Sequence, residues 1–261
     1  MSFLKTQQVA QHITAWLSNY CDKAGLSGFI IGISGGVDSA LTSTLCAMTG
    51  KKTIVLSMPI RQTSAEYSRA MNHIENLKKR FDNVEYFDID LTSTFEEFVS
   101  KMPFDLKEHH LAMANSRARL RMTTLYSLGQ AYQCLVAGTG NKVEDFGIGF
   151  FTKYGDGGVD LSPIADLNKT EVWTVSKEVG VIDEIISAKP TDGLWEDGRS
   201  DEDQIGASYQ ELEWAMSFKG DEGELNERQS EVLKIYTRLH AANKHKIEPI
   251  PVCLIPIELK G

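Results

Sequence analysis

Two hydrophobic patterns alternate along the first half of the chain. Apolar residues recur at helical spacing between positions 9 and 20, which predicts an amphipathic N-terminal helix that ends near Gly25. Residues 29–33 are apolar apart from one glycine, a pattern typical of a strand buried on both faces. Helical spacing returns at 37–48, with Gly50 as a stop signal. These positions predict a helix, a buried strand, a tight glycine turn and a second helix.

The alternation continues to about residue 138. Strand patterns at 53–59 and 84–89 flank a helical pattern at 64–80, and a long helical pattern at 108–133 leads into an apolar run at 134–138. Strands separated by helices pair in parallel through right-handed crossovers. The predicted fold class is therefore α/β, with a doubly wound, mostly parallel sheet and helices on both faces.

The second half of the chain is less regular. Residues 147–158 are rich in glycine and predict irregular structure, whereas 168–179 has helical spacing. Residues 190–204 combine glycines and charges without periodicity, which predicts a long loop of the kind that forms lids. Two closing helices are expected at 201–218 and 226–243, before a tail that contains prolines.

Composition limits the class of protein. The 261 residues suit one large domain, here 1–261, and carry 36 acidic against 27 basic side chains, a formal charge of −9. A net acidic chain is poorly suited to gripping a phosphate backbone, so no nucleic acid partner is expected. The four cysteines show no close pair, and the N-terminus has no leader-like apolar run. We therefore expect a cytoplasmic protein that does not bind a membrane.

A glycine-rich turn follows the first predicted strand and opens the second helix. Its residues are Gly32, Ile33, Ser34, Gly35, Gly36, Val37, Asp38 and Ser39. In open α/β sheets ligands bind outside the carboxyl end of a strand, and backbone amides at a helix N-terminus favour an anion such as phosphate. Asp38 would repel that phosphate unless a cation lay between them. The turn therefore predicts a nucleotide site with Mg²⁺.

Two other motifs compete for the same turn. A Walker loop is excluded because no Lys-Ser or Lys-Thr pair follows Gly36. A nucleophile elbow remains open, since residues 32–36 satisfy Gly-x-Ser-x-Gly, and His240 or His245 could complete a hydrolase triad with Ser34. That interpretation gives no role to Asp38.

The turn at residues 34–39 resembles the pyrophosphate loop of the ATP pyrophosphatases, and a second block narrows the resemblance. Residues 150–163, Phe-Phe-Thr-Lys-Tyr-Gly-Asp-Gly-Gly-Val-Asp-Leu-Ser-Pro, closely resemble the signature of the NAD synthetase family. The blocks at 117–122, 138–144, 167–169, 189–191 and 245–246 are similar to that family as well. The resemblance thus spans nearly the whole chain.

This resemblance implies an adenine nucleotide alpha hydrolase-like fold and a ligase. The implied reaction is the ATP-dependent amidation of deamido-NAD to NAD with ammonia, through an adenylated carboxylate, with release of AMP and pyrophosphate. The chain leaves no room for a glutaminase domain, so the resemblance is to the ammonia-dependent branch, whose members are homodimers. A binding module for adenine nucleotides and a tRNA thiolation enzyme are the remaining alternatives, the latter disfavoured by the acidic charge and scattered thiols.

Site residues are implied by the same matching. Asp38 and Glu144 match the magnesium ligands, with Asp145 as the alternative to Glu144 because the segment before Phe150 is one residue longer than in the bacterial branch. Besides the glycine turn, the positions that match ATP contacts are Thr139, Lys169 and Thr191. The positions that match deamido-NAD contacts are Arg119, Lys153, Asp160, His245 and Lys246. Asp156 matches a carboxylate that takes a proton from ammonium, since only neutral ammonia is a nucleophile.

Overall fold

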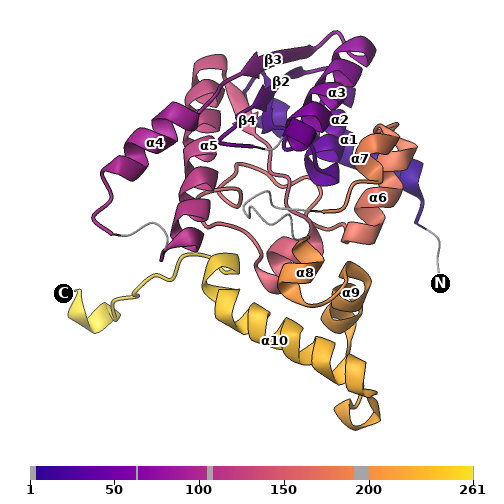
Figure 1. Ribbon diagram of the computed structural model, residues 1–261, viewed down its shortest axis with the longest axis vertical. Coiled ribbons are helices and arrows are strands. Elements are labelled where there is room, and N and C mark those ends of the chain that lie inside the picture. The colour runs from indigo at the N-terminus through magenta and orange to yellow at the C-terminus, as the bar shows by residue number, and fades with distance from the viewer. Residues whose placement is uncertain (1–3, 63, 105–107, 191–199, 261) are drawn as a thin grey trace.

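The computed structural model describes residues 4–62, 64–104, 108–190 and 200–260. Its centre is a parallel sheet of four strands in the order β3-β2-β1-β4 (Figure 1). The strands are β1 (Gly28–Gly32), β2 (Lys52–Ser57), β3 (Val84–Asp88) and β4 (Cys134–Val136). In register, Gly28 lies opposite Lys52 on one side and Cys134 on the other. The predicted parallel sheet is therefore confirmed.

Helices cover both faces of the sheet because successive strand side chains point to opposite sides. Phe29 and Ile31 pack in a core with helices on one face, whereas Ile30 packs in a second core on the other. The helices of the first face are α1 (Thr6–Ala24), α2 (Val37–Met48), α3 (Ser64–Arg80), α6 (Lys169–Glu178) and α7 (Asp183–Ile186). Those of the second face are α4 (Thr92–Ser100) and α5 (His110–Tyr132). The doubly wound architecture is as expected.

A smaller layer packs below this sheet body and has its own apolar cluster, in which Val143, Tyr209, Leu212 and Val232 are buried. We define the smaller layer as η1 (Lys142–Ile148, a π-helix), α8 (Asp201–Ile205), α9 (Tyr209–Ser217) and α10 (Glu227–Ile247) (Figure 1). Two short 3₁₀ turns, η2 (Glu222–Glu224) and η3 (Ile257–Leu259), complete the described elements. Among the described residues, no helix combines the length and the apolar character that a bilayer span requires.

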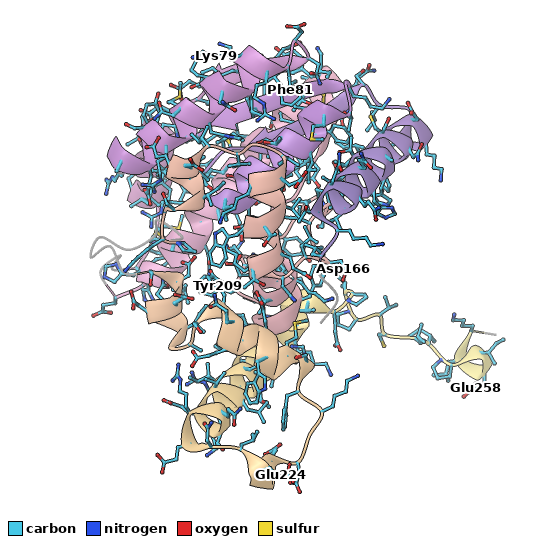
Figure 2. All side chains as sticks on the ribbon, turned by 90° about the vertical axis from the view of Figure 1, so that its right-hand side faces the viewer. Lys79, Phe81, Asp166, Tyr209, Glu224 and Glu258 are labelled. Atoms are coloured by element: carbon cyan, nitrogen blue, oxygen red, sulfur yellow. The ribbon has the colours of Figure 1, made fainter. Side chains whose placement is uncertain are left out.

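The structure corrects several details of the sequence prediction. Helix α4 was not expected, and η1 occupies part of a stretch that was predicted without regular structure. The closing helix at 201–218 is in fact two helices, because Gly206 has a φ of +87° and ends α8. The loop predicted at 190–204 therefore contains a helix at its end, while 191–199 lie outside the described residues. After α10 the chain leaves the body as an exposed arm that reaches Glu258 (Figure 2).

Candidate active site

The glycine turn has a fixed shape at the carboxyl end of β1. Gly35 has a φ of +85°, and a Cβ atom there would lie 2.7 Å from the backbone oxygen of Glu66, so only glycine fits. The Ser34 and Ser39 hydroxyls are 3.1 Å apart, and Ser39 Oγ also donates to the Gly36 oxygen at 3.0 Å. Gly36 is the N-cap of α2 and has no side chain to accept from its first amides. These amides are therefore suited to an anion.

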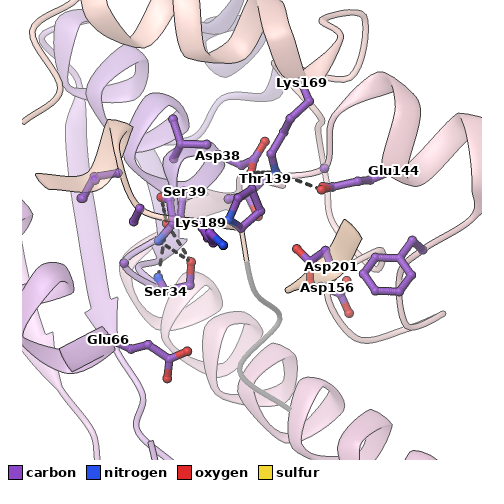
Figure 3. Close-up of a pocket in the computed structure, with 18 of the residues that line it drawn as sticks. Ser34, Asp38, Ser39, Glu66, Thr139, Glu144, Asp156, Lys169, Lys189 and Asp201 are labelled. Carbon is purple, nitrogen blue, oxygen red and sulfur yellow. Dashed lines mark hydrogen bonds and ion pairs between the residues drawn. The ribbon is translucent and has the colours of Figure 1, made fainter. Parts of the chain in front are cut away.

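Three buried or half-buried charged side chains meet beside this turn (Figure 3), and Asn141 joins two of them. Lys169 Nζ lies 2.6 Å from Asp38 Oδ2 and 2.9 Å from Glu144 Oε1. Asn141 Nδ2 donates to the other oxygens of the same two carboxylates, at 3.0 Å to Asp38 and 2.6 Å to Glu144. The structure thus brings Asp38, Glu144 and Lys169 to one point, although they are far apart in the sequence.

Helix starts position two of these side chains. Lys169 is the first residue of α6, whose N-cap Asn168 forms a capping box with Glu171. Glu144 is in the first turn of η1, and its backbone N–H donates to the side chain of the N-cap Asn141 at 3.0 Å. Asn141 therefore both caps η1 and holds the two carboxylates.

The local charges perturb the pKa values of several groups. Burial disfavours the Lys169 ammonium, but Asp38 and Glu144 outweigh that effect and hold the pKa of Lys169 above its ordinary value. Burial, together with the charges of Asp156, Glu144 and Asp38, raises the pKa of Asp145 well above its usual range. Removal from bulk water also raises the pKa of Asp156, although the Thr152 amide opposes this by donating to its Oδ1 at 3.0 Å. Carboxyl groups are therefore crowded together beside the glycine turn.

Two cavities open from this point. The first, of about 180 Å³, is lined by the glycine turn, Asp38, Glu144 and Lys169. The second, of about 680 Å³, extends along α5 to the end of α10 and falls within the usual size range of ligand pockets. The residues that line both cavities are Ser34, Glu66, Thr139, Phe150 and Asp156. The two cavities therefore adjoin, and Asp156 lies at the junction because it lines both.

Cations line the larger cavity. Arg119 Nε donates to the Lys153 oxygen at 3.2 Å, and Lys153 Nζ donates to the His245 oxygen at 2.6 Å. Lys246 Nζ donates to the Phe151 oxygen at 2.7 Å, and burial lowers its pKa. The turn at 150–153 and the end of α10 are thus held together by the same side chains that face the cavity.

Two predicted residues are not placed in these cavities. Asp160 accepts from the Tyr126 hydroxyl at 2.9 Å and from the Val136 amide at 2.8 Å, and it lines neither cavity. Thr191 lies outside the described residues. Asp145 lines the first cavity beside Gly140, but it is Glu144 that shares Lys169 with Asp38.

The structure adds polar residues that the sequence did not single out. Asn141 and Tyr209 are fully buried at the charged point, and Asp201 lines the first cavity. Arg121, which lies in the block 117–122, donates to the Met58 oxygen at 3.0 Å, and burial lowers its pKa to about 10. Tyr209 could have been noticed from the capping box that begins at Ser208, a signal of a helix start.

The hydrolase alternative is not supported by the geometry of the turn. The Ser34 hydroxyl is engaged inside the turn, where it accepts from the Gly36 amide at 3.2 Å. His240 Nδ1 is 2.6 Å from the Gly147 oxygen, and His245 Nδ1 is 3.2 Å from the Ala242 oxygen. In the described part of the chain, neither His240 nor His245 is hydrogen-bonded to Ser34.

Comparisons with solved structures agree with the fold. NMN synthetase from Francisella tularensis superposes with a TM-score of 0.84 at 31% identity, over 98% of this chain and 100% of that one. NH3-dependent NAD synthetase from Campylobacter jejuni superposes with a TM-score of 0.77 at 23% identity, over 96% and 100%. The fold is thus the predicted α/β fold of the adenine nucleotide alpha hydrolase-like type.

Sequence comparisons give the family. The NH(3)-dependent NAD(+) synthetase of Methanosarcina acetivorans is 37% identical over 261 residues, which covers 97% of this chain and 98% of the relative. That of Thermococcus kodakarensis is 38% identical over 217 residues, covering 82% and 81%. The model of the NAD synthase family matches residues 9–249. With its pyrophosphate-type turn and paired carboxylates in place, this chain belongs to the NAD synthase family.

Proposed function

We propose that the chain is a carbon–nitrogen ligase that amidates deamido-NAD to NAD, using ammonia and ATP and releasing AMP and pyrophosphate. One observation carries the proposal: an anion-binding helix start and a pair of carboxylates open, through Asp156, into a large cavity lined by cations. An adenylated nicotinate carboxylate would form at that junction, where ATP from one cavity meets the acceptor from the other. Ammonia then displaces AMP from the carboxyl carbon.

The donor set at Asp38 and Glu144 fits Mg²⁺. Both carboxylates present oxygen atoms to a common point, where the Lys169 ammonium now lies. Within the described part of the chain there is no group of three or more acidic, histidine or cysteine ligands, so phosphate oxygens and water would complete the shell. When bound, the ion would neutralise charge on the departing pyrophosphate.

The protein groups would divide the remaining work. The first amides of α2 hold the phosphates, and Lys169, once it leaves the carboxylates, is a compact charge suited to a phosphate oxygen. Thr139 and Thr191 are the further ATP contacts of the proposal. Asp156 accepts a proton from ammonium at the junction, a role that its raised pKa favours.

The acceptor would bind in the larger cavity. Arg119, Lys153, His245 and Lys246 supply positive charge or hydrogen-bond donors there for an anionic dinucleotide. Asp160 remains part of the proposed acceptor site, although in the single chain it lines neither cavity. The proposal includes a cytoplasmic homodimer in which residues 1–261 form one domain.

The similarity to NMN synthetase favours a second candidate acceptor. Nicotinate mononucleotide carries the same carboxylate as deamido-NAD but lacks the adenylate half. Its amidation would need the same turn and carboxylates, and it would leave part of the larger cavity unused.

One experiment tests both candidates. Pure protein is incubated with ATP and Mg²⁺, with either acceptor and with ammonium or glutamine, and NAD, NMN, AMP and pyrophosphate are measured. We expect NAD and AMP in equal amounts from deamido-NAD and ammonium. A larger specificity constant for nicotinate mononucleotide would select the second candidate. Release of AMP without NAD or NMN would refute both candidate acceptors. A complete absence of ATP cleavage would refute the proposed ligase reaction itself.

A further inference from the structure

Tyr209 lies at the junction between the sheet body and the smaller layer (Figure 2). Its side chain is fully buried, and its ring packs edge-on against Trp173 with centroids 5.9 Å apart. Its hydroxyl donates to Glu144 Oε1 and lies 3.3 Å from Asp201 Oδ2, while Lys169 Nζ lies 4.9 Å from the ring centroid. A phenylalanine would fill the same apolar space, so the buried hydroxyl must be accounted for by its polar contacts.

Glu144 is held by donors of two kinds. Lys169 Nζ bonds Oε1 with a charge, whereas the Tyr209 hydroxyl and Asn141 Nδ2 bond it without one. A divalent cation between Asp38 and Glu144 would repel the Lys169 ammonium from its present position. The two neutral donors could stay, because neither opposes the ion.

The Tyr209 hydroxyl is fixed as a donor. A phenol at neutral pH carries one proton, which it can donate to a single carboxylate. That single proton is directed to Glu144, the closer of the two carboxylates. The backbone N–H of Asp201 donates to the Pro190 oxygen at 3.1 Å, which fixes the start of α8 at the wall of the first cavity.

We propose that Tyr209 is a positioning residue: its hydroxyl keeps Glu144 turned toward Asp38 when Lys169 leaves, so that the two carboxylates form a divalent-cation site. The proposal rests on the proposed function for the assignment of Glu144 to the metal. Tyr209 itself touches neither the ion nor the substrates. Outer-sphere hydrogen bonds of this kind contribute strongly to metal affinity.

Tyr209→Phe tests the proposal, with Tyr236→Phe as the matched control in the same layer. Free Mn²⁺ is followed by electron paramagnetic resonance while the ion is titrated into protein with ATP, against a titration without protein. We expect Tyr209→Phe to bind Mn²⁺ about 10-fold more weakly. The control should match the wild type, and the affinity of Tyr209→Phe for ATP without metal should not change.

A kinetic measurement separates positioning from general damage. The Mg²⁺ concentration for half-maximal pyrophosphate release should rise in Tyr209→Phe, and kcat should recover at saturating Mg²⁺. Equal Mn²⁺ affinity in Tyr209→Phe and the wild type would overturn the proposal, as would a loss of kcat that Mg²⁺ does not restore. If the wild type makes no NAD, the proposed function fails, while the Mn²⁺ titration still reports on Tyr209.

A second variant covers a failure of Tyr209→Phe to fold. Asp201→Asn keeps the Tyr209 hydroxyl and removes the charge that competes for its proton. Mn²⁺ affinity should therefore stay or tighten in Asp201→Asn. A weaker affinity would contradict the proposal.

Discussion

Asp38 and Glu144 face the same Lys169 ammonium, yet they stand on supports of opposite kinds. Asp38 belongs to α2, a regular helix in which 10 of 12 residues are buried against the sheet and its neighbouring helices. Glu144 belongs to η1, a π-helix that packs on α9 and α10 and is held by polar contacts with Asn141 and Tyr209. One side of the site is set by apolar packing of the sheet body, and the other by a few buried hydrogen bonds.

This difference separates phosphate binding, which is common to the architecture, from the choice of acceptor, which is particular to this family. A helix start at the end of a parallel strand can hold phosphate in any protein with this architecture. The smaller layer supplies the second carboxylate and, from the end of α10, His245 and Lys246 of the larger cavity. In the proposed function these groups contribute to the choice of acceptor. Variants on the two sides should therefore differ in which substrate they affect.

The largest effect is expected on the sheet side, from Asp38→Asn. The amide removes one of the two charges next to Lys169 and a proposed metal ligand. We expect pyrophosphate release to fall by more than about 100-fold, the upper range for groups that merely support a metal ligand. Asp166→Asn, an exposed partner of Lys142, is the control. An unchanged rate at saturating Mg²⁺ would contradict the metal assignment.

Lys153→Ala should affect the other substrate. Its ammonium lines the larger cavity and also holds the end of α10 through the His245 oxygen. We expect the KM for deamido-NAD to rise about 10-fold or more, the size of a charge-assisted contact, with little change for ATP. Steady-state kinetics with Lys142→Ala as control measure this. An equal rise in the KM for ATP and for deamido-NAD would contradict the assignment of separate substrates to the two sides of the site.

Asp145→Asn should stabilise the protein at neutral and alkaline pH. Because the folded state raises the pKa of Asp145, this carboxyl stabilises the fold only below its unfolded pKa of about 3.9, and the contribution is lost as pH rises through the folded value. At pH 8 we expect the Tm of the variant to exceed that of the wild type by about 2–4 °C, the change that about 1 kcal/mol produces in a chain of this size. Thermal unfolding should show the advantage shrinking toward pH 4. A difference independent of pH would point to packing instead.

Arg228→Ala should have the smallest effect. Its guanidinium bonds both carboxylate oxygens of Glu211, at 2.7 and 2.8 Å, and lowers the pKa of Glu211 to about 2. The pair therefore stabilises the fold above the unfolded pKa of about 4.3, and its contribution is lost as pH falls through about 2. The pair is exposed, so solvent screens both charges and its contribution to the free energy of unfolding is small. Unfolding at pH 7 and near pH 2 checks this, and a large loss at pH 7 would mean that the smaller layer depends on its surface contacts.

The sequence predicted the sheet side because local and global preferences agree there. The continuous apolar run of β1 and the glycines of the turn are visible without any tertiary information. The π-helix at η1 was missed because its shape depends on Asn141 and on Gly149, whose φ is +65°, and no periodic pattern marks it. Asp38 was singled out by its charge at the glycine turn, whereas Glu144 and Lys169 were chosen by family resemblance. Only the folded chain shows that one ammonium joins the three side chains.

The burial of α2 also sets how long the helix that follows the glycine turn persists. Amide hydrogens in a helix covered on every side exchange with solvent only when the whole molecule opens, whereas exposed helix ends exchange by local fraying. The amides beyond Asp38 belong to the first class, since residues 39–47 of α2 are all buried. The end of α10, with exposed His245, belongs to the second. The end of α10 can therefore open and close many times while α2, which follows the glycine turn, stays folded for as long as the whole molecule does.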